Sequence, residues 1–180
     1  KEIIGLADYR KNDKVRDLIL LLAQRVGSKL DIDRLSQELQ ITRATVYSYL
    51  SFLEATYFIY LASPLSRSID RTVSGRQKVY FCDNGILKIM AKLSEGQILE
   101  NGVYNQLKFY GKVNYYQQKT GNEIDFIVDK AAGYEVKKTV TSIDMKRAEK
   151  ISQKLKLDSI NIVSRNYVEN VKNIKFAQFL

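Results

Sequence analysis

The sequence predicts a mixed α+β / α/β fold that is built in two parts. Apolar residues recur at helical spacing through much of residues 13–55, whereas short aromatic and β-branched runs alternate with helical stretches after residue 98. A Ser-Glu-Gly sequence at residues 94–96 interrupts the pattern between the two parts. We therefore expect a first domain over residues 1–93 and a second domain over residues 94–180.

The first part is expected to begin with three helices. The first helix covers residues 13–26, and the second starts at a cap on Asp31 or Asp33 and runs to about residue 39. Thr42 can cap the third helix. The apolar positions that define these helices are Val15, Leu18, Ile19, Leu22, Val26, Leu35, Leu39, Val46, Leu50 and Leu53.

Two strands and a short helix are expected to complete the first part. Residues 57–62 are rich in aromatic and β-forming side chains, and residues 78–81 return to the same pattern. The intervening residues 63–77 are polar and basic, so we expect a loop there. The Asp-Asn-Gly sequence at residues 83–85 signals a turn, and a short helix should follow to about residue 91.

The second part is expected to follow the order helix, strand, strand, strand, helix, strand. Gly121 and the Ala-Ala-Gly sequence at residues 131–133 supply turns between the strands. The expected elements are a helix over residues 98–110, strands over 113–118, 123–128 and 134–137, a helix over 143–155, a strand over 159–163 and an edge strand over 174–180.

Composition narrows the class of protein. The chain has 180 residues, of which 45% are hydrophobic, and a formal net charge of +9. This positive excess favours an anionic partner, with nucleic acid ahead of a membrane surface. No apolar run reaches the roughly 18 residues of a membrane span, and no signal peptide is visible. The lone cysteine, Cys82, excludes an internal disulfide, so we expect a cytoplasmic protein without a membrane partner.

The chain contains no histidine, which removes several kinds of catalysis. A Ser-His triad, a Cys-His pair and a His-ligated zinc or iron site are all excluded. The single cysteine cannot build a zinc–thiolate cluster. Hydrolysis of a phosphodiester would therefore need carboxylates that hold Mg²⁺ or Mn²⁺, since both ions prefer oxygen ligands.

Residues 31–54 have the pattern of a helix-turn-helix, in which apolar side chains pack two helices across a tight turn. The third helix would present arginine, hydroxyl and tyrosine side chains near its start to the major groove of DNA. The two strands would form a wing whose basic residues approach phosphates. The expected DNA-binding residues are Arg43, Thr45, Tyr47 and Ser48 on the helix and Arg67, Arg71, Arg76 and Lys78 on the wing.

This part resembles winged helix-turn-helix proteins, and the resemblance implies double-stranded DNA as a partner. Gln40 stands where glycine is common in the turn, and a left-handed glutamine costs about 1 kcal/mol. An ordinary three-helix bundle, or a winged helix that contacts protein, is the alternative.

Acidic residues and a lysine form a second candidate site. The alternation of side chains along a strand puts Glu135 and Lys137 on the same face, and Asp125 lies on the preceding strand. Two carboxylates held close together repel each other unless a cation lies between them, and a hard divalent cation there can polarise a phosphate and activate water. We expect Asp125, Glu135 and, from the upstream helix, Glu100 as metal ligands. Lys137 would lie beside the attacking water.

These residues resemble the motif of the PD-(D/E)XK nuclease superfamily. Asp125 matches the motif aspartate, Glu135-Val136-Lys137 matches the (D/E)XK triplet, and the expected order αβββαβ matches the core of that fold. The resemblance implies a metal-dependent deoxyribonuclease, in which these charged residues and Glu100 are catalytic. The alternative is a surface salt bridge between Glu135 and Lys137 in an ordinary sheet.

Four segments in this order strengthen the resemblance: KVYFCDNGIL at 78–87, LENGVYNQL at 99–107, YYQQKTGNEIDFIV at 115–128 and YEVKK at 134–138. Together they resemble the C-terminal half of archaeal and bacterial AAA-type ATPases that carry the domain DUF4143. The resemblance implies an ATPase module ahead of Lys1, while this chain lacks the GxxxxGK(S/T) motif and cannot bind ATP by a P-loop. The alternative is that the nuclease-like half is an inactive scaffold that contacts the ATPase module or a partner.

Overall fold

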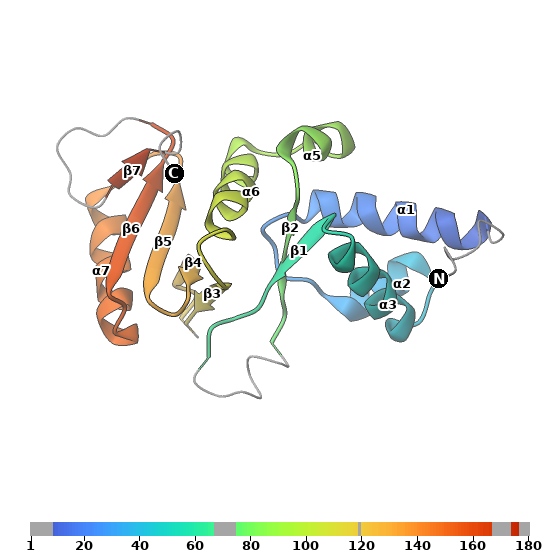
Figure 1. Cartoon of the computed structure of the whole chain (residues 1–180), viewed down its shortest axis with the longest axis horizontal. Helices are drawn as coiled ribbons and strands as arrows, with labels where there is room; N and C mark the ends of the chain where they lie inside the picture. Colours follow the sequence, from blue (N-terminus) through green and yellow to red (C-terminus); the bar gives the residue numbers. More distant parts are fainter. Residues whose placement is uncertain (1–8, 67–74, 119, 167–173, 177–180) are drawn as a thin grey trace.

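The computed structural model describes residues 9–66, 75–118, 120–166 and 174–176, which form a mixed α+β fold with six helices and two sheets. Figure 1 shows the first three helices at one end and the five-stranded sheet at the other, with β1, β2 and α6 between them. The helices are α1 (Tyr9–Gln24), α2 (Ile32–Leu39), α3 (Arg43–Ala55), α5 (Asn84–Met90), α6 (Glu95–Leu107) and α7 (Ser142–Leu155). The strands are β1 (Ile59–Ala62), β2 (Lys78–Phe81), β3 (Val113–Gln117), β4 (Glu123–Val128), β5 (Ala132–Lys137), β6 (Ser159–Ser164) and β7 (Ile174–Phe176).

Side-chain caps start α2 and α3 at the predicted positions. The Asp31 carboxylate accepts a hydrogen bond from the backbone N–H of Arg34 at 3.0 Å, and Thr42 Oγ1 accepts one from the N–H of Thr45 at 3.1 Å. Each bond satisfies an N–H that the helix itself leaves unpaired, a contribution of typically about 1 kcal/mol. Gln40, between the two helices, has the left-handed backbone expected of it, with φ 53° and ψ 45°.

Strands β1 and β2 pair in an antiparallel fashion, with Ile59 opposite Phe81 and Ala62 opposite Lys78. The strand β1 begins two residues later than predicted. The reason is the backbone of Tyr57, whose φ of 58° lies in the left-handed region and cannot continue a strand.

The second half has the predicted order of helix, three strands, helix and strand. Its sheet has the strand order β3-β4-β5-β6-β7, in which β3, β4 and β5 are antiparallel and β6 and β7 are parallel to their neighbours. Helix α6 begins three residues earlier than predicted because Ser94 and Gln97 form a reciprocal capping box. The predicted edge strand is present at its start, as β7, while residues 177–180 lie outside the described part of the chain.

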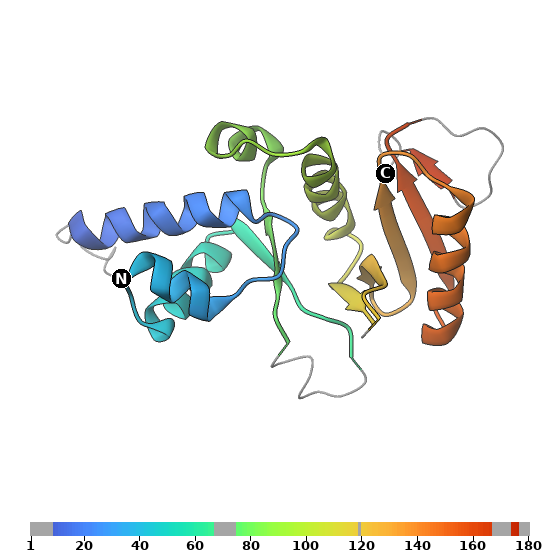
Figure 2. The ribbon, with the colours of Figure 1, turned by 180° about the vertical axis from the view of Figure 1, so that it is seen from behind.

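Buried apolar side chains from both halves form one large cluster, which includes Leu22, Val79, Leu107, Phe126 and Val163. Helices α6 and α7 lie on opposite sides of the sheet (Figures 1 and 2), and a smaller cluster lies under α7. Across the described residues, none of the helices combines the length and the apolar character that a membrane crossing demands.

Candidate functional site

Glu135 and Lys137 lie together near the end of β5, as the alternation of the strand predicts. Lys137 Nζ is 2.7 Å from Glu135 Oε1, and Arg147 on α7 donates to the same oxygen at 3.0 Å. The Glu135 side chain is only 2% exposed, so water contributes little to the stability of its charge. The two cations therefore compensate a carboxylate that burial would otherwise destabilise.

Asp125 reaches the same region because the register of β4 shifts. The shift lies between Asn114 and Tyr116 of β3, so that Asp125 and Phe126 both face a single residue of β3. A bulge of this kind redirects a side chain and is common next to functional sites. The backbone pairing of β4 with β5 ends at Phe126, and beyond it Asp125 Oδ2 accepts a hydrogen bond from the N–H of Val136 at 2.8 Å. The carboxylate thus replaces the next backbone bond of the ladder.

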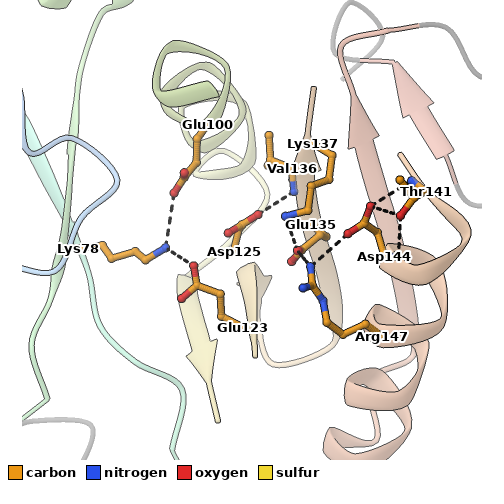
Figure 3. Close-up of polar contacts among 10 residues, drawn as sticks. All are labelled: Lys78, Glu100, Glu123, Asp125, Glu135, Val136, Lys137, Thr141, Asp144 and Arg147. Atoms are coloured by element: carbon orange, nitrogen blue, oxygen red, sulfur yellow. Dashed lines mark hydrogen bonds and ion pairs between the residues drawn. The ribbon is translucent and has the colours of Figure 1, made fainter. Parts of the chain in front are cut away.

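Lys78, on β2, brings the first half of the chain into this region (Figure 3). Its Nζ lies 3.4 Å from Glu123 Oε1 and 3.6 Å from Glu100 Oε1, and its side chain is 5% exposed. The hydroxyl of Tyr80 donates to the same Glu100 oxygen at 2.8 Å. The structure corrects the expectation that Lys78 lies on the surface of a wing. A buried ammonium held by two carboxylates is not free to contact a DNA phosphate.

Gly27, which follows α1, leaves room for the Glu100 carboxylate. Its φ is 75°, and a Cβ atom placed there would lie 3.1 Å from both carboxylate oxygens of Glu100. The left-handed backbone and the close approach both favour glycine. Gly27, which directly follows the predicted first helix, therefore borders a group of buried and partly buried charged residues that we call the carboxylate cluster. Its members are Glu100, Glu123, Asp125, Glu135, Lys78, Lys137 and Arg147.

Burial raises the pKa of the central carboxyl groups. For Glu100 the pKa rises to about 7 through burial, against the opposing effect of Lys78 and with a further rise from Asp125. For Glu135 the pKa also rises to about 7, through burial and then the nearby Asp125 charge, while Lys137 opposes the rise. The pKa of Asp125 is raised by burial as well. These carboxyl groups hold protons more readily near neutral pH than exposed ones do.

The pKa values of the two lysines of the cluster are also raised, which for a lysine favours the charged form. Burial acts to lower the pKa of Lys78, but Glu100 and its acidic neighbours outweigh it and the pKa is raised. The same holds for Lys137, where burial opposes and the Glu135 charge raises the pKa. Both ammonium groups therefore stay charged at neutral pH.

Two of the three expected metal ligands suit a divalent cation. Glu135 Oε2 is a buried oxygen that lacks a hydrogen-bond partner among the described residues, and such an atom costs free energy unless a cation or a proton joins it. Asp125 and Glu135 supply the oxygen donors that Mg²⁺ or Mn²⁺ prefers. Glu100 instead contacts Tyr80 and Lys78. Within the described ranges no three acidic side chains converge as a metal-binding group, so Glu100 does not complete the site as expected.

Two of the four arginines expected to contact DNA, Arg43 and Arg76, lie near carboxylates of their own half. Arg43 Nε, at the start of α3, is 3.1 Å from Asp33 Oδ1, and an Arg76 nitrogen is 3.0 Å from Asp31 Oδ2. All four side chains are more than a third exposed, so these ion pairs are weak. A phosphate would have to compete with the two aspartates for the arginines.

The remaining residues predicted to contact DNA differ in their exposure and in their hydrogen bonds. Tyr47 is 53% exposed on α3, whereas Thr45 Oγ1 lies 2.8 Å from the hydroxyl of the helix cap. Ser48 Oγ donates to a backbone oxygen one turn earlier at 3.1 Å. Arg67 and Arg71 lie outside the described residues.

Three members of the cluster did not emerge from the sequence. Glu123 lies two residues before Asp125, and Arg147 lies on the following helix with no local signal. Lys78 carried a signal that could have located it. It opens a strand whose four residues are all buried, and a lysine in such a strand needs a charged partner.

Comparison with known proteins matches the two parts of the chain to two domains without a stated activity. Residues 1–97 match the domain of unknown function DUF8612, more than half of the chain, and the chain belongs to that family. Residues 95–177 match the domain of unknown function DUF4143, which supports the predicted resemblance for the second half.

One curated relative extends the comparison. The chain is 30% identical over 179 residues to the uncharacterized protein MJ1544 of Methanocaldococcus jannaschii. The match covers 90% of this chain and 40% of the relative, so the chain spans well under half the length of that protein. No solved structure matches the chain.

Proposed function

We propose that this chain is a DNA-binding module with a metal-dependent nuclease site, in which a winged helix-turn-helix half precedes a PD-(D/E)XK nuclease-like half. One observation carries the proposal: Glu135 presents a buried oxygen that has no hydrogen-bond partner among the described residues, in a cluster that also contains Asp125 and Lys137. Burial and then the neighbouring Asp125 charge raise the pKa of Glu135, and a cation bound at its unpaired oxygen would oppose both effects. A lysine beside such a pair suits a negatively charged substrate.

The residues of the cluster have separable roles in this proposal. Mg²⁺ or Mn²⁺ held by Asp125 and Glu135 would polarise a phosphodiester and activate water for its hydrolysis. Lys137 keeps its charged ammonium at the other oxygen of Glu135, from which it can offset charge that develops on the phosphate. Arg147 anchors that same oxygen and so fixes the orientation of the Glu135 carboxylate. Lys78 offsets the charge of the remaining acids, which would otherwise repel an anionic substrate.

The first half would supply most of the DNA affinity. Helices α2 and α3 meet at a tight turn at Gln40, α3 exposes Tyr47 and Arg43, and β1 and β2 form an antiparallel pair that would act as the wing. The net charge of +9 favours phosphate contacts, which bind duplex DNA without strong sequence preference and weaken steeply with salt. We further propose that an ATPase module, which the sequence resemblance to AAA-type ATPases with DUF4143 implies, acts together with this chain.

A second candidate function is an inactive scaffold that contacts the ATPase module or a partner chain. The position of Glu100 favours it. Because Lys78 and Tyr80 engage that carboxylate, the proposed ligand set has two acids instead of three. Lysine and arginine side chains already offset part of the charge of the cluster.

Incubation of the 180-residue chain with duplex, branched and single-stranded DNA in Mg²⁺ or Mn²⁺ distinguishes the two candidates. We expect cleavage that a chelator abolishes and that Asp125→Asn and Lys137→Ala both eliminate. Cleavage that survives either substitution would come from a contaminant or another site. Failure to cleave any of the three substrates would favour the scaffold.

A further inference from the structure

A groove of about 490 Å³ lies between β1, the end of α6 and the start of β3. None of its lining residues belongs to the carboxylate cluster, so the groove is a separate feature of the surface. Aromatic rings and lysines dominate it, and we call it the aromatic groove. Its defining residues are Tyr57, Tyr60, Tyr104, Lys108, Phe109 and Lys112.

Two large aromatic side chains of the aromatic groove face solvent. Tyr57 is 72% exposed and Phe109 is 80% exposed. Exposed apolar surface of this size gains free energy when a partner covers it. The backbone of Tyr57 also has a φ of 58°, which bulky residues rarely adopt, and strain of this kind is typical of positions that display a functional side chain.

The cations of the aromatic groove are free of acidic partners. Lys108 Nζ lies 3.9 Å from the centre of the Tyr60 ring and 5.3 Å from that of Phe109. Within the ranges that the structure describes, neither Lys108 nor Lys112 forms an ion pair, and the lining residues include no carboxylate. The backbone N–H of Lys112 donates to Asp129 Oδ1 at 2.8 Å, and the Lys112 ammonium takes no part in that bond. These lysines differ in this respect from Arg43 and Arg76, which form ion pairs with Asp33 and Asp31.

We propose that the aromatic groove binds unpaired bases of single-stranded nucleic acid. Every base has a flat face that stacks on an exposed ring, and lysines between the rings neutralise the accompanying phosphates. Tyr57 and Phe109 are the stacking surfaces, and Lys108 and Lys112 are the phosphate contacts. Lys108 Nζ donates a hydrogen bond to the amide oxygen of Asn105 at 2.8 Å, which leaves its positive charge uncompensated. A purely apolar protein partner would not neutralise the charges of Lys108 and Lys112, whereas a polyanion would.

The aromatic groove is connected to the carboxylate cluster through α6. Tyr104 stacks on Tyr80 with ring centres 4.3 Å apart, and the Tyr80 hydroxyl bonds to Glu100. Glu100 and Lys108 are eight residues apart, which is about 12 Å along a helix axis. A bound strand would thus lie within a few nucleotides of the cluster. Binding itself does not depend on the proposed cleavage.

Fluorescence anisotropy with labelled oligo(dT) and oligo(rU), in a chelator that prevents cleavage, tests the proposal directly. Phe109→Ala and Tyr57→Ala should each raise the dissociation constant about 10-fold, because each removes a stacking surface. Phe109→Tyr should retain wild-type affinity, since it keeps the ring. Tighter binding of one oligonucleotide identifies DNA or RNA as the preferred strand.

Charge-matched variants distinguish binding in the aromatic groove from non-specific electrostatic attraction to the basic chain. Lys108→Ala combined with Lys112→Ala should weaken binding, whereas the exposed α7 pair Lys150→Ala and Lys154→Ala should leave it nearly unchanged. Circular dichroism confirms that each variant is folded. No oligonucleotide binding at low salt, or equal losses for the two lysine pairs, would overturn the proposal. Sedimentation would reveal self-association through the aromatic groove if a second copy is the occupant instead, and that result would also overturn it.

Discussion

Lys78 Nζ, on β2, lies 3.6 Å from Glu100 Oε1, on α6, and the pair joins the two halves of the chain. Lys78 falls in the part that matches DUF8612, and Glu100 falls in the part that matches DUF4143. The second half alone would therefore contain a buried acidic cluster without one of its cations. The candidate nuclease site is a property of both halves together.

Substitution of Lys78 tests this dependence. We expect Lys78→Met to lower the free energy of unfolding by about 3 kcal/mol above neutral pH, because removal of one partner leaves a buried carboxylate uncompensated. The loss should be smaller near pH 6, because Glu100, with its pKa raised to about 7, then takes up a proton. Urea unfolding at the two pH values measures both effects.

Two control variants complete that experiment. Lys150→Met, at an exposed position of α7, should leave stability within about 0.5 kcal/mol of the wild type. Adding Glu100→Gln to Lys78→Met should recover part of the loss, since the uncompensated charge is then absent. An equal loss at both pH values would argue against Glu100 as the group left uncompensated.

The raised carboxyl pKa values predict a specific pH dependence of stability. Glu100 and Glu135 have folded-state pKa values of about 7, above the ordinary 4.5, so the native state binds more protons than the unfolded state between these values. Their contribution is present below about pH 4.5 and is lost as the pH rises toward 7. Urea midpoints should therefore fall across this window, and Glu135→Gln should flatten the decline while the exposed Glu149→Gln does not. Urea midpoints that rise with pH in the wild type and in Glu135→Gln would contradict the raised carboxyl pKa values.

A divalent cation should stabilise the fold by mass action if Asp125 and Glu135 bind it. At a concentration about 100 times the dissociation constant the gain is about 2.7 kcal/mol, which appears as a higher melting temperature. We expect Mg²⁺ or Mn²⁺ to raise the melting temperature of the wild type but not of Asp125→Asn or Glu135→Gln. Scanning fluorimetry with and without a chelator measures the shift. A shift of equal size in Asp125→Asn would place the metal elsewhere.

The proposed DNA binding of the first half predicts opposite changes in affinity when either member of the Arg43–Asp33 ion pair is replaced. Arg43→Ala should weaken duplex DNA binding and reduce the salt slope by about 1, whereas Asp33→Ala should strengthen binding because it frees Arg43 for a phosphate. Anisotropy with a labelled duplex at several salt concentrations measures both. Arg16→Ala on α1, similarly exposed, is the matched control. Weaker binding by both Arg43→Ala and Asp33→Ala would argue that α3 does not contact DNA in this way.

Local chemistry determined the elements that the sequence predicted well. Asp31 and Thr42 cap their helices because a side-chain oxygen a few atoms away can satisfy a free N–H, and this needs no tertiary contact. Glu135 and Lys137 share a face because side chains alternate along any strand. Gln40 adopts a left-handed backbone because the turn between two packed helices requires it.

Tertiary structure decided which charges are buried and how they pair. The apolar strand that begins with Lys78 indicates that this lysine needs a charged partner, but it does not identify Glu100 and Glu123, because those partners lie on other elements far along the chain. The bulge that redirects Asp125 arises from the register of two strands, which depends on the whole sheet. A net charge of +9 determines that the chain attracts anions. Only packing decides which lysine is buried against carboxylates, as Lys78 is, and which lysines carry a charge that no carboxylate compensates.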